Sequence, residues 1–410
     1  MAVVTYRGGT QLTDETALRA HLANLLRLEN VGLLLGAGAS VSAGGRTIKQ
    51  LWNDFVQDAP ADSQWLVDER FIDASAIAAG DARVFPNVET LVDQLEVALR
   101  EWLRTTDAKL ARGQAVRSQL FRSVVKAAVL KEAWWTSPRG AEDDFTDLED
   151  QRSILQKFTS ARQPGQAAPW VFTTNYDLAI EWAAESIDLQ VINGFLGLHG
   201  RRFSPQSFDL GFRNTQARGE ARFGVYNIYL AKLHGSLTWK EESDQLFEVQ
   251  ASNAWEDIRS FRDGESDHLG YLVLPSAAKY IQTVGFVLGE MLRRFSEFLA
   301  RPQTSLIIAG YGFGDEHINR LLRSALLNPT LQIVVYLPEF TALDATEGLP
   351  PAVKRLLSLQ NPRLTIVGGG ADAYLNALAK HLPEPAIYDE DLKALEMKLR
   401  GPDRDDGAGA

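Results

Sequence analysis

The side chains of this sequence that could carry out chemistry lie in short motifs, each of which directly follows an apolar run. His234 lies in AKLHGSLTW, and Asn175 lies in VFTTNYD. Histidine exchanges protons near neutral pH, and the glycine after His234 leaves room for a substrate. The amide of Asn175 can hold a water molecule or a hydroxyl group without adding charge. Both residues are therefore candidates for contact with a substrate.

The VFTTNYD motif places four polar side chains at the end of a predicted strand, namely Thr173, Thr174, Asn175 and Asp177. Ligands of open parallel sheets bind outside the carboxyl ends of the strands, so these side chains are placed to contact one. The alternative is an Asx turn that caps the following helical segment, and Asp177 could serve as that cap. We favour a structural role for Asp177 and a ligand role for Asn175.

A single histidine is more often a packed or capping residue than a catalytic one, so residue type alone does not assign His234. His199, in GFLGLHG, shares the His-Gly pair and is the obvious rival, although it lies in less regular sequence. The sequence leaves open whether His199 contributes.

Two glycine-rich turns are candidate phosphate sites. The first is GAGAS at residues 36–40, and the second is GYGFGDEHI, which begins at Gly310 and opens a helix at Asp315. Glycine adopts backbone angles that other residues resist, and a helix start offers unpaired N–H groups to an anion. The full Gly-x-Gly-x-x-Gly pattern is not met, because Val41 stands where the third glycine would be. Either turn could be a connection without a ligand, but two such turns at strand ends favour a dinucleotide.

Short apolar runs recur along the chain, and each predicts a buried strand. The predicted strands are residues 31–35, 170–173, 189–192, 227–233, 271–274, 305–309, 331–337 and 363–367. Helical spacing of apolar residues predicts helices over residues 178–186, 284–299, 318–327 and 371–381. This alternation predicts an α/β, Rossmann-like fold, in which a parallel sheet has helices on both faces.

Residues 62–163 interrupt the alternation with helical patterns and an acidic run, EDDFTDLED. We predict that they form a helical insertion module within a discontinuous Rossmann-like domain of residues 1–61 and 164–385. Residues 203–223 are rich in Gly, Arg, Asn, Ser and Gln, and we predict a mobile loop or an interface arm there. Residues 386–410 are predicted to hold a C-terminal helix and a disordered tail.

The composition is that of an ordinary globular protein, with 410 residues, 45% hydrophobic and 23% charged. A formal net charge of −11 argues against nucleic acid as a direct ligand. The chain has no cysteine, which excludes disulfides, a thiolate nucleophile and a four-cysteine zinc site. We see no basic leader and no apolar run near the ~20 residues that span a bilayer, so we expect a cytoplasmic protein without a membrane segment.

In chain order, GAGAS, TTNYD, KLHGS followed by Trp239, and GYGFGDEHI resemble the motifs of the sirtuin (silent information regulator) family. They are most similar to its bacterial anti-phage defence branch, whose members destroy NAD. The resemblance runs from residue 31 to about residue 367, and the four motifs in order are far more specific than any one of them.

The resemblance implies a role in binding NAD for Gly36, Ala37, Gly38, Ser40, Thr174, Gly310, Gly312 and Asp315. The first glycine turn would line the diphosphate, and the second would border the adenosine ribose. Asn175 would help to place the attacking water beside the nicotinamide ribose, with Asp177 close behind it. His234 would be the general base that acts on the ribose hydroxyls.

The sequence departs from the deacetylases of the family at three points. After the glycine turn they carry Pro-Asp-Phe-Arg, whereas this chain has Gly45-Arg46-Thr47-Ile48. The serine that is usual in the fourth motif is missing, with Gly312 or Gly314 in its region. The four-cysteine zinc module that helps to form the acyl-lysine groove cannot be made without cysteine.

The resemblance therefore implies an NAD hydrolase that uses NAD as a substrate and requires no metal. It also implies control by assembly into a homo-oligomer, by a nucleotide signal, or by a partner such as a HerA-type hexameric ATPase. Two alternatives remain open: an NAD-dependent protein deacylase and a catalytically silent nucleotide sensor.

Overall fold

The computed structural model describes residues 3–12, 14–137, 146–163, 165–212, 227–267, 269 and 283–384. The strands are β1 (Val4–Arg7), β2 (Thr10–Gln11), β3 (Asn30–Leu35), β4 (Trp170–Thr173), β5 (Gln190–Ile192), β6 (Phe195–Leu196), β7 (Arg201–Phe203), β8 (Asn227–Lys232), β9 (Trp239–Glu242), β10 (Gln245–Glu248), β11 (Thr304–Ala309), β12 (Leu331–Tyr336) and β13 (Leu364–Gly368). The α-helices are α1 (Glu15–Leu26), α2 (Ile48–Asp58), α3 (Pro60–Asp68), α4 (Val88–Thr105), α5 (Leu110–Val129), α6 (Glu132–Thr136), α7 (Glu149–Ser160), α8 (Ala179–Glu185), α9 (Ala251–Arg262), α10 (Thr283–Ala300), α11 (Glu316–Ala325), α12 (Pro351–Ser358) and α13 (Leu375–His381). Among these helices, none combines the length and the apolar character that a bilayer crossing requires.

The larger sheet has nine strands in the order β2-β1-β13-β12-β11-β3-β4-β8-β5. The seven strands from β13 to β5 are parallel, whereas β1 and β2 add an antiparallel edge beside β13. The predicted parallel sheet is confirmed. The antiparallel edge was not predicted, because four residues of β1 are too few to show a clear alternation.

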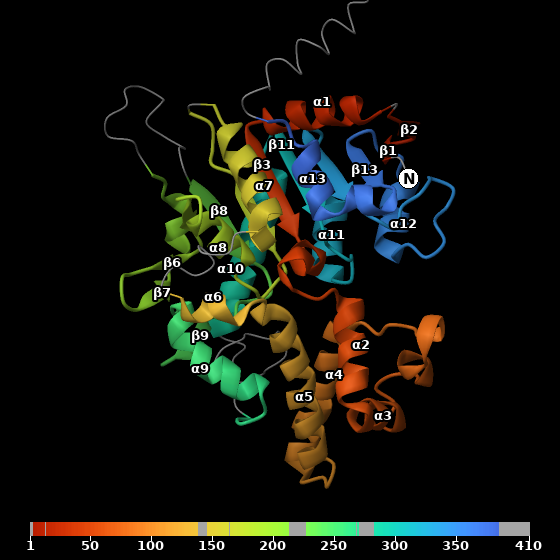
Figure 1. Cartoon of the computed structure of the whole chain (residues 1–410), viewed down its shortest axis with the longest axis vertical. Helices are drawn as coiled ribbons and strands as arrows, with labels where there is room; N and C mark the ends of the chain where they lie inside the picture. Colours follow the sequence, from red (N-terminus) through yellow and green to blue (C-terminus); the bar gives the residue numbers. More distant parts are fainter. Residues whose placement is uncertain are drawn as a thin grey trace, which may run out of the picture.

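Helices cover both faces of this sheet, as the predicted fold class requires, and they pack on it through apolar side chains (Figure 1). Leu33 and Leu35 of β3 pack in one cluster with residues of α1, α7, α8 and α13. Leu34 points to the opposite face and packs in a second cluster with residues of α10, α11 and α12. Successive side chains of a strand point to opposite faces, so a strand buried on both faces must be apolar throughout.

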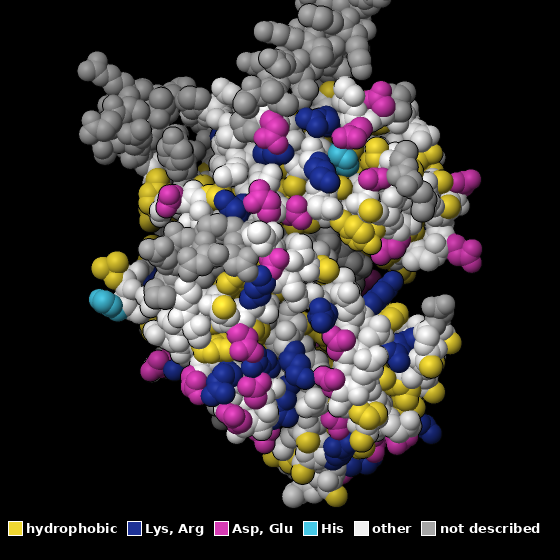
Figure 2. Space-filling view, in the orientation of Figure 1, with side chains coloured by type: hydrophobic (Ala, Val, Ile, Leu, Met, Phe, Trp, Pro, Cys, Tyr) yellow, Lys and Arg dark blue, Asp and Glu magenta, His cyan; other side chains and the backbone are white. Residues whose placement is uncertain are grey.

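A third apolar cluster lies in a helical bundle made of α2 to α5 together with the segments between them. Trp52 and Phe55 of α2 form part of this cluster. In Figure 1, β3 points toward this bundle, which lies on the carboxyl-end side of the sheet. Figure 2 shows Lys and Arg side chains interspersed with Asp and Glu on this part of the surface. Ion pairs such as Lys126 with Asp58, at 2.8 Å, give the bundle a face of mixed charge.

A second, four-stranded antiparallel sheet has the order β6-β7-β10-β9, and its strands come from two segments, since β6 and β7 precede β8 in the chain while β9 and β10 follow it. Residues 203–212 of the predicted arm form the end of β7 and a short 3-10 helix (Pro205–Asp209), and the rest of the arm lies outside the described residues. The predicted strand at residues 271–274 and the predicted C-terminal helix and tail also lie outside them.

Candidate functional site

Four neighbouring parallel strands bring the four motifs to one edge of the sheet. The strands are adjacent in the order β11-β3-β4-β8, and each is followed by one motif. Thr173 of β4 pairs with Lys232 of β8, so Asn175 and His234 each follow the paired position by two residues. The carboxyl ends of parallel strands are where open α/β sheets bind ligands.

The two glycine turns pack directly against each other. The N–H of Gly38 donates to the carbonyl oxygen of Gly310 at 2.9 Å. A Cβ on Gly310 would lie 2.3 Å from the backbone nitrogen of Ala39, and a Cβ on Gly36 would lie 2.6 Å from the carbonyl oxygen of Gly310. Gly310 also has a φ of +65°, which favours glycine. These glycines are therefore needed for the contact between the turns, a requirement that the sequence motifs alone do not show.

Gly312 and Gly314 differ from these glycines, because no protein atom lies on the side where a Cβ would be. We call this side the open side. A Cβ on either residue would meet nothing within 4 Å. Neither has a φ in the left-handed region, and both are exposed. Steric packing and backbone strain thus give no reason for glycine at these two positions. A ligand that approaches the backbone closely would give one.

Asn175 connects the loop after β4 to the first glycine turn. Its Nδ2 donates to the carbonyl oxygen of Gly36 at 3.1 Å and to Oγ of Ser40 at 2.9 Å. Its backbone N–H donates to Oγ1 of Thr173 at 3.0 Å. Both side-chain bonds that Asn175 makes to described residues leave from Nδ2, so Oδ1 remains as the acceptor atom of this amide.

Thr174, Ala37 and Ser40 also lie at this edge of the sheet. The N–H of Thr174 donates to the carbonyl oxygen of Leu35 at 3.1 Å. Ser40 is buried, while Thr174 and Ala37 are half-buried. All of the predicted binding residues therefore lie in the loops that follow β11, β3 and β4.

Asp177 makes hydrogen bonds to the start of α8 and to Lys232, which are contacts within the fold. Its Oδ1 accepts from the N–H of Ala179 at 3.1 Å, in the first turn of α8. Its carbonyl oxygen accepts from Nζ of the buried Lys232, which also donates to Oε1 of Glu181 at 2.7 Å. Burial raises the pKa of the Glu181 carboxyl, and the Lys232 ammonium opposes this rise. Lys232 thereby ties the loop that carries Asn175 to the strand that leads to His234.

His234 and Asp315 form a side-chain pair that joins the loops of two strands that are not neighbours. Nε2 of His234 lies 2.8 Å from Oδ2 of Asp315, and both side chains are 11% exposed. β3 and β4 separate the strands to which these loops belong. The resemblance placed Asp315 at the adenosine ribose, and in the structure this carboxylate contacts the candidate base.

Asp315 is also the N-cap of α11. Its Oδ1 accepts from the N–H groups of His317 at 2.6 Å and Ile318 at 3.1 Å. Burial tends to raise the pKa of the Asp315 carboxyl, but the bond and charge of His234 and the two N–H donors outweigh it. The net result is a pKa below the ordinary value, so the carboxylate is ionised at neutral pH.

His199 lies away from this arrangement of motifs. It is exposed on the turn between β6 and β7, in the smaller sheet. Of the two rival histidines, only His234 lies at the carboxyl ends of the central strands.

Two contacts at the site have no signal in the sequence. Nε2 of Gln151 in α7 donates to the carbonyl oxygen of Ala39 at 2.7 Å, and Nδ2 of Asn87 donates to the carbonyl oxygen of Gly314 at 3.1 Å. Both residues come from segments that lack a recognisable motif. Only the folded chain brings them to the glycine turns.

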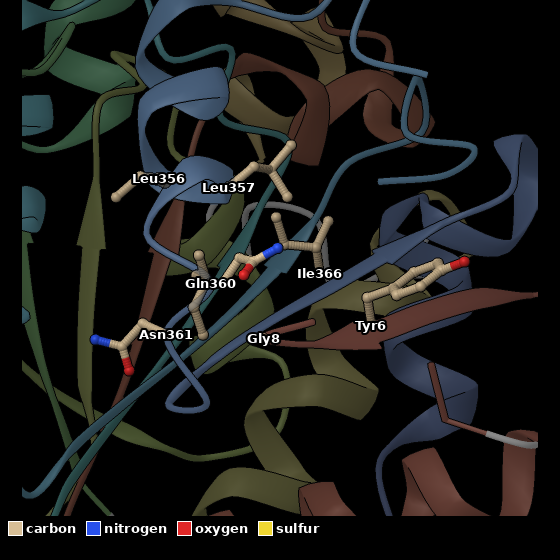
Figure 3. Close-up of a pocket in the computed structure, with 8 residues that line it drawn as sticks. Tyr6, Gly8, Leu356, Leu357, Gln360, Asn361 and Ile366 are labelled. Atoms are coloured by element: carbon tan, nitrogen blue, oxygen red, sulfur yellow. The ribbon is translucent and has the colours of Figure 1, made fainter. Parts of the chain in front are cut away.

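A small cavity lies elsewhere, at the outer edge of the sheet (Figure 3). It encloses about 10 Å³ and is lined by Tyr6, Gly8, Leu356, Leu357, Gln360, Asn361, Leu364 and Ile366. This volume is of the order that holds one water molecule. In the part of the chain that the structure describes, no group of three or more His, Asp or Glu side chains could hold a metal ion.

Comparison with known protein families gives a match over part of the chain. Residues 169–347 match the family model described as a SIR2-like domain, and no curated protein matches the chain. The matched span contains Asn175, His234 and Asp315, while the first glycine turn precedes it. SIR2-like domains use NAD, so the match supports a function that involves NAD. Together with the four motifs at adjacent strand ends, it supports the sirtuin-like family for this chain.

Proposed function

We propose that this protein hydrolyses NAD at the bond between nicotinamide and ribose and releases nicotinamide and ADP-ribose. The observation that carries the proposal is the pair of His234 and Asp315 at the strand ends that also hold Asn175. A binding module needs a surface for NAD, but it has no need of a proton acceptor oriented by a carboxylate.

The proposed reaction breaks the glycosidic C–N bond, and the bonding electrons leave with nicotinamide, which departs as a neutral molecule. Positive charge develops on the ribose, and a water oxygen forms the new bond to the same carbon. Oδ1 of Asn175 orients this water, because Nδ2 is already bonded to the first glycine turn. The proton that the water loses passes to His234.

Asp315 determines which nitrogen of His234 takes the proton. When Nε2–H donates to the Asp315 carboxylate, Nδ1 carries the lone pair and is the basic atom. The ionised carboxylate then stabilises the imidazolium that forms. Asp315 thereby acts as a positioning residue in the proposed reaction, in addition to its role as a helix cap.

The open sides of Gly312 and Gly314 are where a ribose or phosphate of NAD can approach the backbone of the second turn. In the proposed complex, Gly36, Ala37, Gly38, Ser40, Thr174 and Gly310 complete the binding surface. The contact between the two turns fixes this surface before NAD arrives, which lowers the entropic cost of binding.

We place this activity in bacterial anti-phage defence by depletion of NAD. An enzyme that consumes NAD without restraint would kill its host, so the proposal includes control by homo-oligomerisation or by a partner such as a HerA-type ATPase. The helical bundle of α2 to α5 lies on the site side of the sheet and is the segment best placed to transmit such control.

The test measures the release of nicotinamide and ADP-ribose from NAD. It compares the wild-type chain with Asn175→Ala and His234→Ala, each alone and with a candidate ATPase. We expect turnover by the wild type and a loss of roughly 10²- to 10⁴-fold for His234→Ala. Measurement of NAD binding by calorimetry separates a loss of chemistry from a loss of binding.

Two other outcomes would replace the proposal. Nicotinamide release that depends on an acyl-lysine peptide, with an acylated ADP-ribose as product, would identify a protein deacylase. NAD that binds and changes the assembly state but stays intact in every condition would identify a nucleotide sensor.

A further inference from the structure

Gln151 is a buried polar residue that the proposed reaction does not use. It lies in the first turn of α7 and is 2% exposed. Its Nε2 donates to the carbonyl oxygen of Ala39 in the first glycine turn at 2.7 Å. Its other polar atom, Oε1, is buried and receives no hydrogen bond from the residues that the structure describes.

The unpaired oxygen makes glutamine a costly choice at this position. A buried acceptor without a donor costs roughly 1–3 kcal/mol, while one hydrogen bond contributes a net stabilisation of only about 1 kcal/mol. Leu148 and Ile154, three residues before and three residues after Gln151, are buried members of the large apolar cluster, as is Ala39. A methionine of similar length would fill the space and remove the unpaired oxygen, but it would also take away the Gln151 donor to the carbonyl oxygen of Ala39. The two unpaired groups cost about the same, roughly 1–3 kcal/mol each, so folding stability gives no net reason for the amide.

The amide does provide a fixed contact to the first glycine turn. The backbone nitrogen of Ala39 is the atom nearest to the position that a Cβ on Gly310 would occupy. The carbonyl oxygen of Ala39 accepts the hydrogen bond from Gln151 of α7. The first glycine turn therefore has two contacts at Ala39, one with Gln151 through the carbonyl oxygen and one with Gly310 beside the backbone nitrogen.

We infer that Gln151 is a positioning residue that holds the first glycine turn in the conformation that binds NAD. The inference rests on the proposed use of NAD and concerns binding, not the cleavage step. Removal of the donor releases Ala39 and the turn around it, so NAD has to order the turn when it binds. Affinity for NAD falls as a result, and the turnover rate at saturating NAD is unchanged.

The test compares Gln151→Met with the wild type. Gln64→Met is the matched control, because Gln64 is exposed and its Nε2 donates to Asp68 within the same helix, α3, at 2.9 Å. We expect Gln151→Met to retain the wild-type melting temperature and to weaken NAD binding by roughly tenfold, the upper effect of one hydrogen bond. The value of kcat should remain that of the wild type, while KM rises.

Hydrogen exchange provides a readout that needs no ligand. Backbone amides of residues 37–44 should exchange faster in Gln151→Met than in the wild type or Gln64→Met. Unchanged exchange in this segment, or faster exchange with unchanged NAD affinity, would overturn the inference. A lower kcat at unchanged KM would overturn it as well.

The same measurements separate this inference from the proposed hydrolase function. A wild-type chain that binds NAD without hydrolysing it removes the proposed function, and the comparison of affinities still tests Gln151. A wild-type chain that neither binds nor hydrolyses NAD removes both.

Discussion

The two glycine turns have similar sequences and different surroundings. In the first turn, Gly36 and Gly38 face the backbone of Gly310, and a Cβ on any of these three residues would collide with main-chain atoms. In the second turn, Gly312 and Gly314 face open space. A glycine-rich motif can therefore serve packing between loops or the approach of a ligand. Only the structure separates these two uses.

Gly310→Ala tests the contact between the two turns and should have the largest effect on stability. The new Cβ would lie 2.3 Å from the backbone nitrogen of Ala39, at a φ of +65°. We expect a loss of roughly 3 kcal/mol or more in the free energy of unfolding, because neither turn can move without breaking the contact between them. Urea unfolding of the purified variant measures the loss. A change below about 0.5 kcal/mol would mean that the turns do not constrain each other.

Gly312→Ala tests the open side and should leave stability unchanged or raise it by up to about 1 kcal/mol, since alanine restricts the unfolded chain. Affinity for NAD should fall by roughly tenfold if the ligand lies against this residue. Calorimetric titration with NAD, beside urea unfolding, measures both. Wild-type affinity in the variant would remove Gly312 from the binding surface.

Asp315→Asn examines the charge that links the second turn to His234. Asparagine caps helices as well as aspartate does, so the variant retains the cap and loses the charge. The folded pKa of Asp315 is lowered, so its carboxylate stabilises the fold above the unfolded pKa of about 4 and loses this effect as the pH falls through the folded pKa. We expect the wild type to be more stable than Asp315→Asn by up to about 1 kcal/mol at pH 7. Thermal unfolding at a series of pH values from 7 downward should show this difference shrink below the unfolded pKa, and a difference that stays constant would mean that the change in side-chain shape, not the charge, causes it.

Asn87 variants should have the smallest effect. The Asn87 side chain caps α4 by accepting from the N–H of Thr90 at 3.1 Å, and it donates to the carbonyl oxygen of Gly314. Asn87→Asp retains the cap and loses the donor, whereas Asn87→Ala loses both. We expect the two variants to reduce NAD turnover equally, by roughly two- to fivefold.

Stability distinguishes the two functions of Asn87. Only Asn87→Ala should also lose about 1 kcal/mol, in urea unfolding. If NAD turnover fell only in Asn87→Ala, the variant that also loses stability, Asn87 would act as a helix cap and have no further role.

Much of the central sheet could be predicted from the sequence. Strands such as β3 and β11 are buried on both faces and therefore appear as continuous apolar runs. The smaller sheet was not predicted, because strands as short as β6 and β7 show no periodicity. Residue type and motif order made Asn175 and His234 candidates, and in the structure both follow the ends of adjacent strands.

The sequence could not show how the site residues contact one another. His234 and Asp315 are 81 residues apart in the chain, and no local pattern indicates that they are partners. The same limit applies to Gln151, whose contact with Ala39 spans 112 residues. Local periodicity predicts secondary structure, while such contacts depend on the topology of the whole sheet.

The pairing of β3 with β11 has a consequence for synthesis of the chain. Asn30 of β3 pairs with Thr304 of β11, so the first glycine turn leaves the ribosome long before the turn against which it packs. At ordinary translation rates the interval is tens of seconds. The helical bundle of α2 to α5 has its own apolar cluster and can begin to fold in that time. For the proposed NAD hydrolase, this order means that the site is incomplete until the second turn has emerged.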